Sequence, residues 1–86
     1  MDEKTLELYT GTYEVSPHFA FTVRKEGGRL YLQATGQEKL ELFAEAANKF
    51  FLKVNDATLE FVGEGGKITK AILKQGGRAT DAFKVQ

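Results

Sequence analysis

The fold of this chain is decided by residues 19–34, which read FAFTVRKEGGRLYLQA. Apolar and polar side chains alternate along both halves of this stretch, as they do in a strand that buries one face. Between the two halves, Gly27-Gly28 suits the positive φ angles of a tight hairpin turn. The stretch therefore predicts an antiparallel hairpin with an inward face of Phe19, Phe21, Val23, Leu30, Leu32 and Ala34.

The same alternation continues on both sides of this hairpin. A tight turn is expected at residues 35–37 and a looser connection at residues 46–48. Further inward residues are predicted at Leu40, Leu42, Ala44, Phe50, Leu52, Val54, Leu59 and Phe61. The complete pattern predicts eight strands at residues 11–15, 19–24, 29–34, 39–45, 50–54, 59–61, 68–74 and 78–85.

Eight short strands joined by short turns exclude a parallel sheet, which needs long crossover connections. The predicted fold class is all-β, as an eight-stranded antiparallel up-and-down barrel, with a two-layer β-sandwich as the alternative. The barrel is favoured because closure removes the exposed strand edges. A chain of 86 residues is long enough for one domain and too short for two, so we expect a single domain over residues 1–86.

Two segments allow a helical interpretation. Residues 40–54 contain helix-compatible side chains, and residues 45–49 could form a helical turn. The alternation on both sides of Ala46-Ala47 favours two strands instead. Residues 4–9 are left undecided between helix and coil, with Leu6 and Tyr9 pointing inward if they are helical.

Composition narrows the function classes. The 12 basic and 12 acidic residues cancel and are interspersed, whereas a nucleic-acid interface needs a concentrated basic face. We therefore expect no nucleic-acid partner. No apolar run approaches a membrane span, and the charged start of the chain is unlike a signal peptide. The absence of cysteine excludes disulfides and thiolate metal sites, and leaves the compartment open.

Catalytic chemistry is not indicated by any motif. His18 is the single histidine and Ser16 the single serine; their closeness in a turn argues against a nucleophile and base in productive geometry. The carboxylates alternate with apolar residues, as on a solvated sheet face. Three Gly-Gly-basic triplets begin at Gly27, Gly65 and Gly76; they are interpreted as hairpin turns, because no helix of a phosphate-binding loop follows them. We predict no catalytic residue, metal or cofactor.

Four aromatic residues lie opposite the predicted inward face or at its margin. Exposed aromatic rings can mark a protein interface. The other interpretations are that both faces of the sheet are partly covered, or that a bulge shifts the register. The candidate interface residues are Tyr31, Phe43, Phe51 and Phe83.

The order of residues resembles that of a poorly characterised bacterial domain family found C-terminal to class C β-lactamase-like serine hydrolases. The similarity begins with a Tyr-x-Gly-x-Tyr start at residues 9–13 and extends over about residues 6–85. Its more specific segments are Ala-Thr-Gly-Gln at residues 34–37 and Phe-Phe-Leu-Lys-Val at residues 50–54. The chain departs from the family at His18, Gly76 and Phe83, where glycine, asparagine and a basic residue are usual.

The resemblance implies a lipocalin-like barrel attached in cis to a serine hydrolase catalytic domain, in a parent protein that is periplasmic or secreted. The Ser-x-x-Lys and Tyr-x-Asn motifs of such hydrolases are absent from this chain, so no catalytic residue carries over. The first hypothesis is therefore a non-catalytic accessory domain that shapes the active-site cleft or mediates domain or subunit contacts. The alternative is a free-standing small barrel that binds a small apolar ligand.

Overall fold

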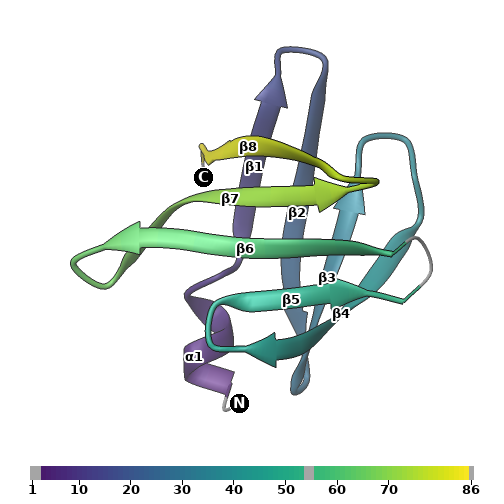
Figure 1. Cartoon of the computed structure of the whole chain (residues 1–86). Coiled ribbons are helices and arrows are strands. Elements are labelled where there is room, and N and C mark those ends of the chain that lie inside the picture. Colours follow the sequence, from purple (N-terminus) through teal and green to yellow (C-terminus); the bar gives the residue numbers. More distant parts are fainter. Residues whose placement is uncertain (1–2, 54–55, 86) are drawn as a thin grey trace.

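The alternating segments form eight strands that pair in sequence order and close into an antiparallel barrel (Figure 1). The structure is a computed structural model, and it describes residues 3–53 and 56–85. The predicted barrel is confirmed, and the two-layer sandwich is excluded. The elements are α1 (Glu3–Glu7), β1 (Gly11–Ser16), β2 (Phe19–Glu26), β3 (Arg29–Ala34), β4 (Lys39–Ala46), β5 (Lys49–Leu52), β6 (Ala57–Glu64), β7 (Lys67–Gln75) and β8 (Arg78–Lys84).

The barrel closes through a short contact between its first and last strands. In the β1–β8 register, Tyr13 opposes Lys84 and Glu14 opposes Phe83. The Val85 N–H donates a hydrogen bond of 2.8 Å to the Thr12 carbonyl just beyond β8. By contrast, β6 and β7 pair along their whole length. The β1–β8 contact is therefore short, but it leaves neither strand as a free edge over these residues.

Residues 40–54 contain two strands and no helix in their described part, as the alternation indicates. Two details differ from expectation. The connection between β4 and β5 is a tight two-residue turn, because Asn48 adopts a φ of 66°, a conformation that asparagine tolerates better than most residues. Ala44 is exposed rather than inward, since the register shifts at a bulge between Ala44 and Ala46. The predicted inward residue Val54 lies outside the described residues.

The undecided N-terminal stretch forms the short helix α1, which lies beneath one end of the barrel (Figure 1). Leu6 and Tyr9 are both buried, at 3% exposure each. The Tyr9 hydroxyl donates a 2.7 Å hydrogen bond to the Asn48 side-chain oxygen in the β4–β5 turn. In the described part of the chain, no helix is long and apolar enough to cross a bilayer.

Aromatic side chains fill the end of the barrel next to α1, which we call the α1 end. The ring of Phe61 lies 4.7 Å from Tyr9, 5.7 Å from Tyr13 and 5.6 Å from Phe50, between ring centroids. Phe21 stacks on Tyr13, with 5.5 Å between the ring centroids. Each buried aromatic ring contributes about 1.5–3 kcal/mol by leaving water. This cluster fills the interior of the barrel at the α1 end.

The opposite end of the barrel, which we call the far end, holds a recess of about 110 Å³. It lies between inward side chains of β2, β3, β4, β5, β6 and β7, with Gln37 and Gln75 also lining it. Ligand pockets for drug-sized molecules measure about 300–1,000 Å³. The recess therefore fits a group of only a few carbon atoms. Its apolar lining consists of Phe19, Phe21, Leu32, Ala34, Leu40, Leu52, Ala57 and Leu73.

Candidate functional site

Ser16 and His18 lie together in the turn between β1 and β2, but their geometry is that of a turn. The His18 backbone N–H donates a 3.3 Å hydrogen bond to the Ser16 hydroxyl. The His18 side chain is exposed, and no hydrogen bond joins it to this hydroxyl in the described structure. Such local bonds from a serine hydroxyl stabilise turns. The pair therefore terminates the strand in this structure, and shows no arrangement of base and nucleophile.

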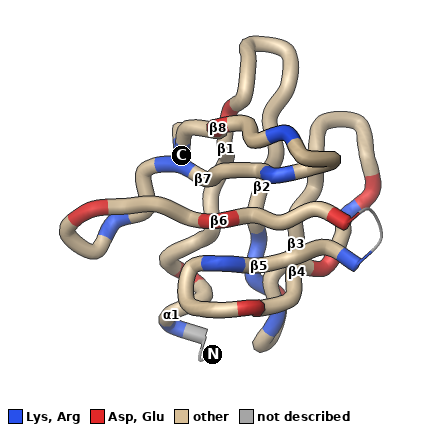
Figure 2. Tube along the Cα trace, in the orientation of Figure 1, with Lys and Arg blue, Asp and Glu red and all other residues tan. Residues whose placement is uncertain are grey.

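Several carboxylates on the outer surface form ion pairs with lysine or arginine; they are Glu7, Glu26, Glu41, Glu45 and Asp81. Figure 2 shows basic and acidic residues interspersed along the strands. The shortest ion pairs join Glu26 to Lys39 at 2.8 Å and Glu7 to Lys25 at 2.9 Å. Within residues 3–53 and 56–85, no three His, Cys, Asp or Glu side chains gather where they could hold a metal ion. Exposed ion pairs of this kind each contribute about 0–1 kcal/mol.

Tyr13 is a described titratable group with a clearly raised pKa. Its side chain is fully buried, and burial raises the pKa of the Tyr13 hydroxyl far above its ordinary value. The hydroxyl donates a 2.8 Å hydrogen bond to the Tyr9 carbonyl. A tyrosine enclosed by other aromatic rings cannot reach a substrate, so this hydroxyl connects β1 to the segment that follows α1 and has a structural role.

The buried Tyr13 hydroxyl predicts a loss of stability in alkali. Tyrosine in the unfolded chain ionises near pH 10, whereas the raised pKa keeps Tyr13 protonated in the folded barrel. Its contribution is fully present below pH 10 and falls as the pH rises further, by up to about 1.4 kcal/mol per pH unit. The Tyr13→Phe variant should be less stable than wild type by about 1 kcal/mol at pH 8, and this gap should shrink above pH 10. Urea unfolding from pH 8 to 11.5 measures it, and a constant gap would contradict the prediction.

Three of the four predicted interface aromatics share one outer face of the barrel, across β3, β4 and β5. Phe43 and Phe51 are register partners, with ring centroids 5.6 Å apart. Tyr31 opposes Glu41, which is two residues before Phe43 on the same face. Lysines form cation–π contacts with two of these rings. The Lys53 ammonium lies 4.2 Å from the Phe43 centroid, and the Lys39 ammonium lies 4.7 Å from the Tyr31 centroid. These three residues, Tyr31, Phe43 and Phe51, are here called the aromatic face, and all are half-buried.

Phe83 does not join the aromatic face. It lies on β8, four strands away from β4 around the closed barrel, and is 57% exposed. The Lys70 ammonium lies 5.9 Å from the centroid of its ring. The structure therefore separates the four predicted interface residues into one cluster of three and one isolated ring.

A groove at the α1 end, which the sequence patterns do not indicate, has a volume of about 580 Å³. Its apolar residues are Leu8, Ile68 and Val85, of which Leu8 is 47% and Val85 54% exposed. Together with Phe83, these two are the exposed large hydrophobic residues of the described structure. Lys67 and Lys84 also line the groove. We call it the end groove.

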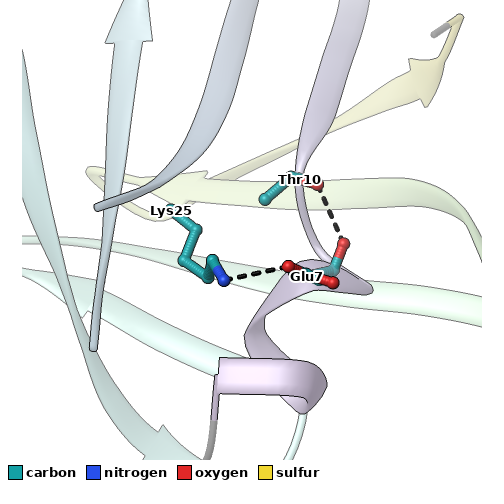
Figure 3. Close-up of polar contacts among 3 residues, drawn as sticks. All are labelled: Glu7, Thr10 and Lys25. Carbon is teal, nitrogen blue, oxygen red and sulfur yellow. Dashed lines mark hydrogen bonds and ion pairs between the residues drawn. The ribbon is translucent and has the colours of Figure 1, made fainter. Parts of the chain in front are cut away.

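Polar contacts of Glu7 with Thr10 and Lys25 fix the end of α1, just before Leu8 (Figure 3). Thr10 donates from its hydroxyl to the Glu7 carbonyl at 2.8 Å, and the Glu7 carboxylate pairs with Lys25 of β2 at 2.9 Å. The N–H groups of Leu8 and Tyr9 donate to carbonyls three residues earlier. Because this turn places Tyr9 in the core, the neighbouring Leu8 side chain is left outside.

Comparison with known proteins places this chain in a family. A family model described as a domain of unknown function (DUF3471) matches residues 1–86. The chain belongs to the DUF3471 family. It is also 30% identical, over all of its 86 residues, to penicillin-binding protein 4* of Bacillus subtilis (strain 168), and the match covers 19% of that protein. No solved structure matches the chain.

Both matches agree with the resemblance stated above. The family is one of unknown function, and the chain corresponds to a minor part of a penicillin-binding protein. The chain spans about a fifth of the length of this curated relative. The description of the DUF3471 family assigns no function. The aromatic face and the end groove are therefore the features of this DUF3471 barrel from which a function can be argued.

Proposed function

We propose that this DUF3471 barrel is a non-catalytic accessory domain of a bacterial serine hydrolase, formed by residues 1–86. In this proposal it packs against the catalytic domain of the same polypeptide and shapes the active-site cleft or mediates domain contacts. The observation that carries the proposal is the match of the whole chain to 19% of a penicillin-binding protein. The Ser-x-x-Lys motif expected of such a hydrolase is absent from the chain.

The interior of the barrel supports this proposal over the ligand-binding alternative. Aromatic rings fill the α1 end, and the recess at the far end measures only about 110 Å³. A lipid or another lipocalin-sized ligand needs several times this volume. The outer surface, by contrast, carries apolar side chains available to a neighbouring domain: Leu8, Val85, Phe83 and the aromatic face.

The first test is the coding sequence around this chain and the activity of its product. We expect an in-frame hydrolase domain with a Ser-x-x-Lys motif, and hydrolysis of nitrocefin or p-nitrophenyl acetate by the full polypeptide. Residues 1–86 alone should not exceed the buffer rate, and deleting them from the full polypeptide should lower kcat/KM or the melting temperature of the hydrolase. Ser16→Ala is the control, and it should leave the hydrolysis of nitrocefin and of p-nitrophenyl acetate by the full polypeptide unchanged.

Two outcomes would overturn the proposal. One is ester or amide hydrolysis by residues 1–86 that Ser16→Ala abolishes, which would make the barrel itself an enzyme. The other is a coding sequence with no hydrolase domain attached to the barrel, which would make ligand binding the leading hypothesis.

A further inference from the structure

The end groove lies where the pairing of β7 with β8 stops. The two strands pair from Gln75 opposite Arg78 to Lys70 opposite Phe83. The register between the two strands ends there, so residues 67–69 of β7 have no register partner on β8 among the described residues. An unpaired strand edge offers backbone donors and acceptors to an incoming extended segment. The end groove therefore has the geometry of a site for one added strand.

The groove also offers a place for apolar side chains. Ile68 of β7 is half-buried in it, and the exposed Leu8 and Val85 side chains also line it. An extended segment directs every second side chain to the same face. A segment added along residues 67–69 could therefore direct an apolar side chain towards Leu8 and Val85.

The charged residues of the groove indicate which side chains the added segment carries. Neither Lys67 nor Lys84 forms an ion pair with a described residue. Glu7, the carboxylate in the groove lining, already pairs with Lys25, and Glu64 opposes Lys67 across the β6–β7 hairpin without an ion pair. Two unpaired ammonium groups beside an apolar groove favour a partner that places a carboxylate next to an apolar side chain.

The position of the groove indicates where such a partner comes from. Val85, the last described residue, lines the groove, and so does Leu8, which directly follows α1. The curated relative is about five times as long as this chain. A domain attached after Val85 would start at the groove, and one attached before α1 would be separated from it by the short helix alone. Attachment on either side raises the effective concentration of the domain at the groove.

We propose that the end groove docks an extended apolar and acidic segment of the hydrolase domain in the same polypeptide, which adds a short strand to residues 67–69 of β7. This inference rests on the proposed function and adds the contact surface to it. The inference assigns the docking to the end groove and not to the aromatic face, which lies on other strands, β3 to β5.

Hydrogen exchange with mass spectrometry tests the inference on the full polypeptide and on residues 1–86. Amides of residues 67–69 should exchange at least about tenfold more slowly in the full polypeptide. The double variant Lys67→Glu/Lys84→Glu should remove this protection, and so should Leu8→Ser. The matched control is Lys74→Glu, which reverses the charge of an exposed lysine near the far end of the same strand; it should leave the protection unchanged.

The outcomes separate this inference from the proposed function. Protection of β3 to β5 instead of residues 67–69 would overturn the end groove as the docking site while leaving the accessory role intact. Unchanged exchange throughout the barrel would overturn both the docking and the packing against the hydrolase. Protection that appears in residues 1–86 alone and rises with their concentration would show that a second copy occupies the groove, which would also overturn the inference. Unaltered melting of each variant in residues 1–86 shows that it still folds.

Discussion

Replacing Gly63 with alanine is expected to lower the free energy of unfolding by about 3 kcal/mol or more. The bulge between Val62 and Gly63 brings this glycine against the start of β7. An added Cβ would overlap the Lys67 carbonyl oxygen and lie 2.8 Å from the Ile68 Cα. Because these are backbone atoms, no side-chain rotation relieves the overlap. For a domain of this size, such a loss lowers the melting temperature by roughly 12 °C or more.

Gly28→Ala is the matched control for this change. Gly28 lies in the β2–β3 turn, its φ is outside the left-handed region, and an added Cβ would meet nothing within 4 Å. The same substitution there should change the free energy of unfolding by less than about 1 kcal/mol, and can stabilise the barrel by restricting the unfolded chain. Thermal unfolding of both variants measures the difference. Equally small losses would show that the bulge moves to accommodate a methyl group.

The second large effect is expected at Phe61, whose replacement by alanine should cost about 3–5 kcal/mol. Phe61 is 2% exposed, and its ring lies among those of Tyr9, Tyr13 and Phe50. Truncation leaves a cavity among rings held by β1, β5 and the segment after α1, so the site cannot collapse easily. Because small domains are stable by only about 5–15 kcal/mol, a large share of the variant should be unfolded at 37 °C.

Phe83→Ala provides the comparison for this prediction. It removes the same side chain from a position that is 57% exposed, and the expected cost in residues 1–86 is within about 0.5 kcal/mol. Urea unfolding of both variants gives the two values. A cost at Phe61 no larger than that at Phe83 would show that the aromatic cluster does not stabilise the α1 end.

Much of the fold can be predicted from the sequence because a strand that buries one face has an apolar residue at every second position. Phe21, Val23 and Leu30 alternate with polar residues, and all three are buried as expected. The pattern fails where a bulge shifts the register, as at Ala44. It also fails at Asn48, where one residue with a positive φ closes the β4–β5 turn. Both exceptions arise from local backbone geometry, which alternation does not encode.

The candidate sites are predictable to different degrees. The aromatic face follows from alternation, because outward positions on neighbouring strands share a surface. The separation of Phe83 from it follows from the predicted strand order, because Phe83 lies on the eighth strand and the other three residues lie on the third to fifth. The end groove could not be predicted, since Leu8 and Val85 come from opposite ends of the sequence and meet only after the barrel closes. A signal was available in Leu8, which follows the inward-facing Leu6 by two residues and therefore faces away from it on a helical turn.

The short contact between β1 and β8 has a consequence for how the barrel is made on the ribosome. β1 can pair with β8 only after Lys84, the register partner of Tyr13, has been synthesised about seventy residues later. The other seven pairings join neighbouring strands and can form as the chain emerges. Contacts between residues distant in sequence form late, and unpaired strand edges are prone to aggregate in the meantime. The barrel cannot close until residues 84 and 85 have left the ribosome, and closure also brings together Leu8 and Val85.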